Sequence, residues 1–184
     1  MDKRILDIHG WMDIQYLEWI QETINNLPDN SLIVELGAWK GKSTLAMLLA
    51  KKSNDILVTV DTWLGQPNLR TAEHRDSIRG DLFLEFMYNM PIKPEWYSGQ
   101  SEGFYYLRME SILASILFAN KSVDFLFIDS DHTKFGEDID AWYRKIKTGG
   151  IISGHDYNWP GAKEAIDDRI DVIGLDDTLW YGYK

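Results

Sequence analysis

The stretch that decides the fold of this chain is ELGAWKGKST, residues 35–44. A β-branched apolar run, residues 31–36, leads into it, and an apolar segment with lysines in its last turn, residues 43–52, follows it. A short buried strand, a turn containing glycine and a helix produce this order of residues. The stretch therefore predicts a strand–loop–helix unit at the start of an α/β domain.

The Gly-Lys-Ser ending of this loop is similar to that of a phosphate-binding loop, but the spacing does not fit one. A Walker loop has four residues between its first glycine and the Gly-Lys pair, whereas three follow Gly37 here. A dinucleotide fingerprint needs its second glycine where Trp39 stands, because a side chain there blocks the pyrophosphate. The loop instead matches Glu-x-Gly-x-x-x-Gly-x-Ser. A tight strand-to-helix turn without a ligand is the alternative interpretation.

Outward from the loop, apolar runs and helical spacings alternate along the chain. We expect strands at 56–60, 123–128, 151–153 and 179–183. We expect helices at 13–27, 135–146, 162–170 and around 82–90, and a polar loop at 70–79. Gly149-Gly150 should end the helix at 135–146 before the next strand begins. Uninterrupted apolar strands that alternate with helices indicate a parallel sheet covered on both faces. Ligands of such sheets bind at the carboxyl ends of the strands.

Length and composition indicate one globular domain, 1–184, with a helical lead-in at 1–30 and a lid insertion at 64–97. The net charge of −10 disfavours nucleic acid and anionic membranes as partners. The absence of cysteine excludes disulfides, thiolate zinc sites and thiol nucleophiles. We find no secretory signal and no apolar run of the roughly 18 residues that a membrane span needs, so we expect a cytoplasmic protein.

Carboxylates and imidazoles follow two of the predicted strands directly. Asp129, Asp131 and His132 come after one strand, and His155 and Asp156 come after another. Such a cluster is costly unless it binds a cation; oxygen ligands suit Mg²⁺, and the imidazoles also permit Mn²⁺ or Fe²⁺. The alternative interpretation of this cluster is a set of charged side chains that are solvated at the rim of a loop and bind no cation.

Several short motifs recur in a fixed order around these residues. They are the glycine loop, Val60-Asp61-Thr62-Trp63, Gly99-Gln100-Ser101, residues 128–132 (IDSDH), residues 149–157 (GGIISGHDY) and Leu179-Trp180. Together they resemble class I S-adenosylmethionine-dependent methyltransferases, in particular the small methyltransferase 24-like family related to macrocin O-methyltransferase. The resemblance covers about four fifths of the chain. It implies a three-layer, Rossmann-like α/β fold with a mostly parallel, seven-stranded sheet.

The resemblance also implies which residues contact the cofactor, S-adenosyl-L-methionine. Glu35 and Gly37 would face its methionine part, and Asp61 would accept hydrogen bonds from the ribose hydroxyls, although capping of the next turn is an alternative for Asp61. Trp63 could lie against the adenine, or belong to the core, and Ser101 could bond the adenine edge. The further residues expected at the cofactor are Trp39, Gly41, Ser43 and Asp129.

For the metal, the resemblance implies Asp129, His155 and Asp156, with His155 standing where relatives carry a carboxylate. A metal there would lower the pKa of an acceptor hydroxyl, and either His132, which we prefer, or Asp131 would take its proton. The predicted activity is O-methylation of a small hydroxylated acceptor. A non-catalytic cofactor-binding or assembly module on the same fold is the alternative, and a homo-oligomer is left open.

Overall fold

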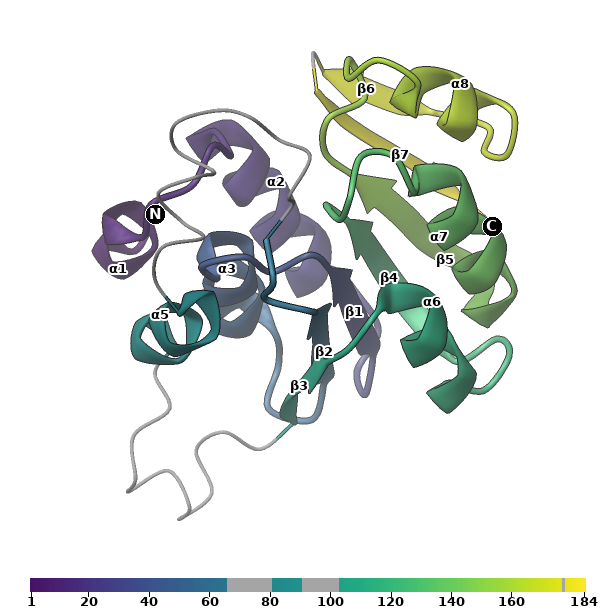
Figure 1. Cartoon of the computed structure of the whole chain (residues 1–184). Coiled ribbons are helices and arrows are strands. Elements are labelled where there is room, and N and C mark those ends of the chain that lie inside the picture. Colours follow the sequence, from purple (N-terminus) through teal and green to yellow (C-terminus); the bar gives the residue numbers. More distant parts are fainter. Residues whose placement is uncertain (66–80, 91–102, 177) are drawn as a thin grey trace.

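The computed structural model describes residues 1–65, 81–90, 103–176 and 178–184, which include a single sheet of seven strands (Figure 1). The strands are β1 (Leu32–Leu36), β2 (Ile56–Asp61), β3 (Phe104–Arg108), β4 (Val123–Ile128), β5 (Ile146–Gly154), β6 (Gly174–Asp176) and β7 (Leu179–Tyr183). Their order in the sheet is β3-β2-β1-β4-β5-β7-β6. The first five run parallel, and β7 runs antiparallel to both of its neighbours. The predicted α/β fold with a mostly parallel, seven-stranded sheet is confirmed.

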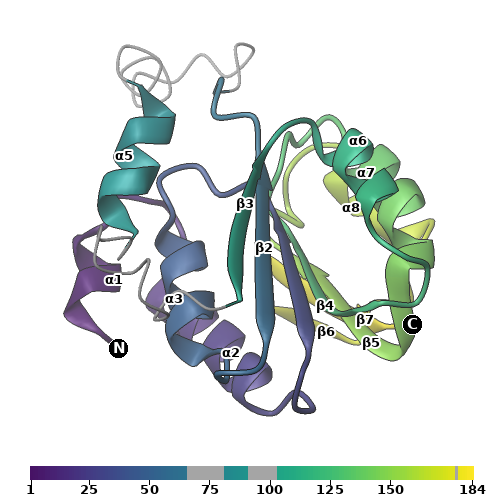
Figure 2. The same cartoon turned by 90° about the horizontal axis from the view of Figure 1, so that it is seen from below.

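Helices cover both faces of the sheet, because its central strands are apolar on both sides; all six residues of β4 are buried. Figure 2 shows the two helical layers on either side of the strands. One layer contains α1 (Lys3–Asp7), α2 (Ile14–Asn25), α3 (Lys42–Ala50) and α5 (Leu82–Asn89). The other contains α6 (Ser111–Ala114), α7 (Phe135–Trp142) and α8 (Ala162–Asp167), with the 3₁₀ turns η2 (Ser115–Leu117) and η3 (Tyr143–Lys145). The three-layer arrangement is therefore also confirmed.

The direction of strand addition reverses between β1 and β4. From β1 the chain adds β2 and then β3 on one side, and it returns to place β4 and β5 on the other side. The loops after β1 and β4 consequently diverge to opposite faces and leave a crevice at the carboxyl ends of the strands. This crevice is where the fold places a ligand.

The predicted helix at 135–146 is too long at its carboxyl end. Helix α7 ends at Trp142, and after a 3₁₀ turn β5 begins at Ile146, so that Gly149-Gly150 lie within the strand and do not end the helix. The register of β5 against β4 shifts between the pairs Val123↔Ile146 and Phe125↔Ile151. Ile146 continued the helical spacing because it is buried, but it is buried as a strand residue.

Some elements carried no clear sequence signal. Strand β3 lies at the edge of the sheet and exposes most of its side chains, so it lacks the apolar run that marks a central strand. The short β6 and α1 were not predicted either. The predicted helix around 82–90 is confirmed as α5, whereas the polar loop at 70–79 and most of the predicted lid at 64–97 lie outside the described residues.

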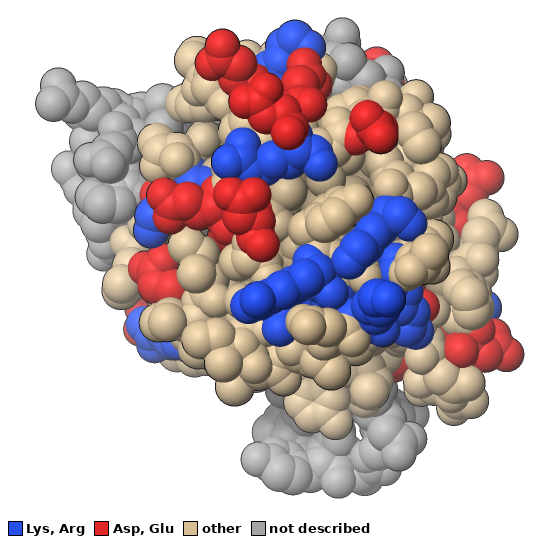
Figure 3. All heavy atoms as spheres, turned by 90° about the vertical axis from the view of Figure 1, so that its right-hand side faces the viewer, with Lys and Arg blue, Asp and Glu red and all other residues tan. Residues whose placement is uncertain are grey.

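Figure 3 shows a band of basic side chains on the face that is the right-hand side of Figure 1. Burial and the nearby Lys121 lower the pKa of Lys184, whose Nζ donates hydrogen bonds to the carbonyl oxygens of Tyr143 and Ile146. These residues lie near the amino ends of β4 and β5, at the end of the sheet away from the crevice.

In the part of the chain that the structure describes, no helix is long and apolar enough to cross a membrane.

Candidate active site

A cavity of about 430 Å³ opens at the carboxyl ends of the parallel strands. The loops that follow the five parallel strands, β1 to β5, line this cavity, and so does the segment before α2. The lining segments include 37–39 after β1, 61–65 after β2, 109–111 after β3, 129–132 after β4, 155–156 after β5 and 10–12 before α2. The crevice predicted from strand order is therefore present as a cavity.

Gly37 lines the cavity at a point where the loop after β1 lies against the loop after β4. Its φ is +88°, and a Cβ on it would lie 2.1 Å from the backbone oxygen of Asp129. Gly41 also has a positive φ, +91°, but a Cβ there would meet Phe86 of α5 and Met90, the residue that follows this helix, and Gly41 does not line the cavity. The two glycines of the motif thus have different roles: Gly37 shapes the cavity, and Gly41 lets α3 pack against α5.

Asp61 stands at the end of β2, lines the cavity and also shapes the glycine loop. Its Oδ2 accepts hydrogen bonds from the amides of Ala38 and Trp39, both at 2.8 Å, and its Oδ1 accepts one from the amide of Trp63 at 2.7 Å. The turn-capping role considered for Asp61 is therefore present in the structure. It does not prevent the carboxylate from meeting a ligand, since each carboxylate oxygen can accept more than one hydrogen bond.

Glu35 does not lie where the resemblance placed it. The side chain is fully buried, does not line the cavity and accepts hydrogen bonds of 2.5–2.6 Å from the hydroxyls of Ser43, Thr44 and Thr59. Burial raises the pKa of Glu35 to about 7, although the three hydroxyls favour its ionised form. Glu35 therefore holds Ser43, which does line the cavity, and has no direct access to a ligand there.

Glu35→Gln tests this burial through the pH dependence of stability. The pKa of Glu35 is raised from 4.5 to about 7 on folding, so its contribution to stability is present below pH 4.5 and is lost as pH rises through 7. We expect the difference in Tm between wild type and Glu35→Gln to fall across this window in thermal melts. The exposed Glu18→Gln serves as control and should leave the pH profile of the wild type unchanged. Parallel profiles for wild type and Glu35→Gln would contradict the buried, protonatable carboxyl.

Three side chains at the ends of β4 and β5 meet in the cavity. Asp129, His132 and Asp156 each offer a ligand atom, and these atoms lie within 4.8 Å of one another. Burial, together with the neighbouring carboxylate of Asp156, raises the pKa of Asp129 to about 6. Burial opposes ionisation of Asp156 too, but hydrogen bonds with His132 and His155 outweigh it and hold the pKa of Asp156 well below its usual range. The predicted juxtaposition of the two strand ends is present.

The imidazole in this group is that of His132, whereas the resemblance had pointed to His155. Nε2 of His155 lies 3.0 Å from the hydroxyl of Thr178, and its Nδ1 lies 3.2 Å from Oδ1 of Asp156. Both ring nitrogens of His155 thus have partners within the protein. The resemblance implied Asp129, His155 and Asp156 for a metal, whereas the three side chains whose possible ligand atoms lie together here are Asp129, His132 and Asp156.

His132 contacts Asp156 and Trp159, and one of its ring nitrogens has no partner in the part of the chain that the structure describes. Its Nε2 lies 2.7 Å from Oδ2 of Asp156, and its ring stacks on Trp159 with the centroids 4.4 Å apart. Its Nδ1 is buried and has no hydrogen-bond partner among the described residues. Asp131, the other candidate base, lines the cavity, and its Oδ1 accepts hydrogen bonds from the amide and hydroxyl of Thr133.

The aromatic residues predicted at the cofactor divide between core and cavity. Trp63 is 4% exposed, packs against Phe83 and Phe86, and donates from Nε1 to the carbonyl oxygen of Trp39. The core role considered for Trp63 is thus present, although part of the residue lines the cavity. Nε1 of Trp39 is buried without a partner in the described part of the chain. Ser101 lies outside the described residues.

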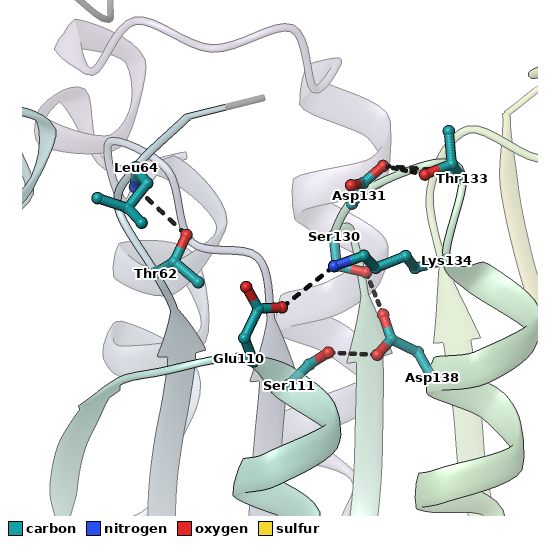
Figure 4. A network of polar contacts seen from close by, with 9 residues as sticks. All are labelled: Thr62, Leu64, Glu110, Ser111, Ser130, Asp131, Thr133, Lys134 and Asp138. Carbon is teal, nitrogen blue, oxygen red and sulfur yellow. Dashed lines mark hydrogen bonds and ion pairs between the residues drawn. The ribbon is translucent and has the colours of Figure 1, made fainter. Parts of the chain in front are cut away.

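Two parts of the cavity wall had not been predicted from sequence. Trp11 of the segment before α2 stacks on Trp39, with the ring centroids 4.4 Å apart, and this segment adds residues 10–12 to the wall. Glu110 and Ser111 follow β3, whose weak signal hid them. Asp138 of α7 also reaches the cavity, because the turn of helix that carries it faces the strand ends (Figure 4).

Comparisons with known proteins agree with this geometry. Residues 34–157 match the sequence profile of a family described as a methyltransferase domain. No curated protein sequence gives a significant match. Among solved structures, the O-methyltransferase NovP shares 18% identity and a TM-score of 0.62, with 96% of this chain and 82% of that chain covered.

Two further structures are similar over most of their length. An O-methyltransferase from Bacillus cereus in complex with SAH shares 15% identity and a TM-score of 0.62, covering 100% of this chain and 92% of that chain. An SAH-bound methyltransferase from Podospora anserina shares 15% identity and a TM-score of 0.62, covering 95% and 80%. With the family match spanning more than half of its length, the chain belongs to this family of methyltransferase domains and is a class I S-adenosylmethionine-dependent methyltransferase.

Proposed function

We propose that this enzyme transfers the methyl group of S-adenosylmethionine to a hydroxyl group of a small acceptor, with a divalent cation, Mg²⁺ in the first place, bound beside the cofactor. The observation that carries the proposal is the group formed by Asp129, His132 and Asp156 inside the cavity. Two of the similar structures described above are O-methyltransferases, which supports the choice of oxygen as the methylated atom.

The cavity has the properties that a cofactor of this kind requires. Its volume of about 430 Å³ lies within the range of small-molecule sites, about 300–1,000 Å³. Asp61 stands at the end of the second strand, where a carboxylate meets the ribose hydroxyls of nucleotides in other α/β sheets. Nε1 of Trp39, which has no hydrogen-bond partner among the described residues, is a donor that a ligand carboxylate or amide oxygen could use. Ser43 and Gly37 complete this side of the wall.

Asp61→Ala should weaken cofactor binding while the protein stays folded. The change leaves ligand hydroxyls and the three loop amides without their acceptor, which costs about 1–3 kcal/mol, or roughly a 5- to 150-fold rise in Kd. Calorimetry with S-adenosylhomocysteine measures the change, and a thermal melt checks folding. Unchanged affinity in a folded variant would leave Asp61 with the role of shaping the loop alone.

The residues of the proposed cation site fit a hard or borderline divalent ion. Two carboxylates and one imidazole suit Mg²⁺ and Mn²⁺ and also permit Fe²⁺. The close approach of Asp129 and Asp156 helps to raise the pKa of Asp129, and a cation between these carboxylates would offset their mutual repulsion. The buried Nδ1 of His132 has no partner in the described residues and could serve as a ligand atom. When bound, such a cation would lower the pKa of the acceptor hydroxyl.

Asp131 is our candidate for the base that receives the proton of that hydroxyl. It lines the cavity one residue from His132, and both of its hydrogen bonds with Thr133 are made by Oδ1, so Oδ2 can face an acceptor. We prefer Asp131 to His132 as base because His132 pairs with Asp156 and belongs to the proposed cation site. If no cation binds, His132 becomes the candidate base.

The proposal is tested by ligand binding followed by a transfer assay. We expect micromolar binding of S-adenosylhomocysteine in calorimetry, and methyl transfer from S-adenosylmethionine to one or more acceptors in a screen of phenols, sugars and other hydroxylated compounds with added Mg²⁺ or Mn²⁺. Failure to bind the cofactor, alongside tight binding of ATP or NAD, would overturn it. Transfer to nitrogen or sulfur acceptors alone would keep the enzyme class and reject the O-methyl assignment.

A further inference from the structure

The loops after β3 and β4 form adjoining parts of the cavity wall and are joined through one buried carboxylate of α7, that of Asp138, which Figure 4 shows hydrogen-bonded to a serine of each loop. Asp138 is fully buried, and its Oδ1 accepts a hydrogen bond from the hydroxyl of Ser111, which follows β3. Its Oδ2 accepts a hydrogen bond from the hydroxyl of Ser130, which follows β4. Each oxygen of Asp138 thus accepts a hydrogen bond from one of the two loops. Asp138, Ser111 and Ser130 all line the cavity.

The same face of α7 holds the loop after β3 at two more points. Lys134 and Trp142 stand four residues before and after Asp138, and side chains at this spacing share one face of a helix. Nζ of Lys134 lies 3.2 Å from Oε2 of Glu110, and Nε1 of Trp142 donates to the carbonyl oxygen of Ser111 at 3.1 Å. Two side chains of α7 and the side chain of its N-cap residue, Lys134, therefore contact the two-residue segment Glu110-Ser111.

The three contacts differ in what they contribute. The pair of Lys134 and Glu110 is solvent-exposed, and such pairs are worth little. Asp138 and Trp142 are fully buried, so a hydrogen bond lost by either leaves a polar group without water to replace the partner. Burial raises the pKa of Asp138, while the hydroxyls of Ser111 and Ser130 favour its ionised form. Asp138 is thus the contact whose loss should matter most, and the only one of the three that also reaches the β4 loop.

We infer that Asp138 is a positioning residue for the methyl-transfer site: through Ser111 and Ser130 it holds the loops after β3 and β4 in the arrangement that binds the cofactor. Ser130 is adjacent to Asp129 of the proposed cation site, so Asp138 ties that end of the cavity to the wall formed by Glu110 and Ser111. Asp138 does not need to touch the reacting atoms for this role. The inference rests on the proposed function of the cavity.

The test compares Asp138→Ala and Asp138→Asn with a control that removes an equally buried hydrogen bond elsewhere. Ser153→Ala is that control, because the hydroxyl of Ser153 is fully buried in β5, donates to the carbonyl oxygen of Leu126 and does not line the cavity. Hydrogen–deuterium exchange of the ligand-free protein reports on the loops. Calorimetry with S-adenosylhomocysteine reports on the site.

Asp138→Ala should speed exchange in segments 109–115 and 129–133 and raise the Kd for S-adenosylhomocysteine about tenfold or more. Asp138→Asn should recover most of the affinity, because its amide can accept from one serine and donate to the other. In turnover, KM for the cofactor should rise more than kcat falls. Ser153→Ala should change neither loop exchange nor Kd. If Asp138→Ala does not fold, Ser111→Ala and Ser130→Ala carry the same test, each with about a threefold rise in Kd.

Two outcomes would overturn the inference. One is unchanged loop exchange and unchanged Kd in a folded Asp138→Ala, or in both serine variants. The other is an equal change in Ser153→Ala, which would reduce the role of Asp138 to general stability. A wild-type protein that binds no S-adenosylhomocysteine would instead overturn the proposed function, and the exchange experiment would still decide whether Asp138 holds the two loops.

Discussion

Asp156→Ala should abolish metal-dependent methyl transfer, by more than about 100-fold, while cofactor binding stays largely intact. Residues that merely support metal ligands cost 10- to 100-fold in affinity or activity when they are replaced, so loss of a ligand should exceed that range. Asp156 also holds the ring of His132 at 2.7 Å, and its removal therefore disturbs two of the three proposed ligands. Transfer assays and Mn²⁺ binding measure the metal-dependent function, and calorimetry with S-adenosylhomocysteine measures cofactor binding.

Controls for this variant come from the same half of the molecule. Asp140→Ala removes an exposed aspartate that pairs with Arg169 outside the cavity, and it should keep wild-type activity. Chelator should reproduce the effect of Asp156→Ala in the wild type, and Mg²⁺ or Mn²⁺ should reverse it there but not in the variant. Full transfer by the wild type in chelator would reject the cation site.

His132→Ala distinguishes the two roles proposed for this residue. As a ligand, His132 is needed for Mn²⁺ binding, and its loss should weaken that binding together with transfer. As a metal-free base, it would be needed for transfer only, and Mn²⁺ binding, if any, would not change. Asp131→Ala should show the second pattern, with Mn²⁺ retained and transfer reduced by the 10²- to 10⁴-fold typical of a lost general base.

Gly37→Ala should lower the free energy of unfolding by about 3 kcal/mol or more and eliminate cofactor binding. A side chain at a φ of +88° is strained, and the new Cβ would lie 2.1 Å from the backbone oxygen of Asp129, which must move. At 2–4 °C per kcal/mol for a chain of this size, Tm should fall by roughly 10 °C. The loop that carries Asp129 would be displaced at the same time.

Gly161→Ala is the matched control for this variant. Its φ is +85°, but a Cβ there would have nothing within 4 Å, so it carries the cost of the backbone conformation without the clash. We expect it to lower Tm by only a few degrees and to leave cofactor binding unchanged. Equal losses in the two variants would show that the close approach of the loops after β1 and β4 is not what requires glycine at position 37.

The sequence alone predicted the central strands, the glycine loop and the meeting of two strand ends. Strands β1, β2 and β4 are buried on both faces, so nearly all of their residues are apolar. Such a continuous apolar run can be recognised in the sequence of the strand itself, without knowing which strands lie beside it. Asp129 and Asp156 could be placed together because parallel strands bring their carboxyl ends to one edge. By contrast, β3 was missed, since an edge strand with exposed side chains has no such run.

Only the tertiary structure decided which polar groups reach the cavity. The hydroxyl of Thr178, between β6 and β7, lies within hydrogen-bond distance of Nε2 of His155. The imidazole that lies with Asp129 and Asp156 is that of His132. The hydroxyl of Thr59 on β2 helps to keep Glu35 in the core, and Asp138 reaches Ser111 across a separation of 27 residues. Apolar burial leaves a periodic pattern along the chain, but a hydrogen bond depends on the orientation of two side chains whose backbones meet only after folding, and no local pattern records that orientation.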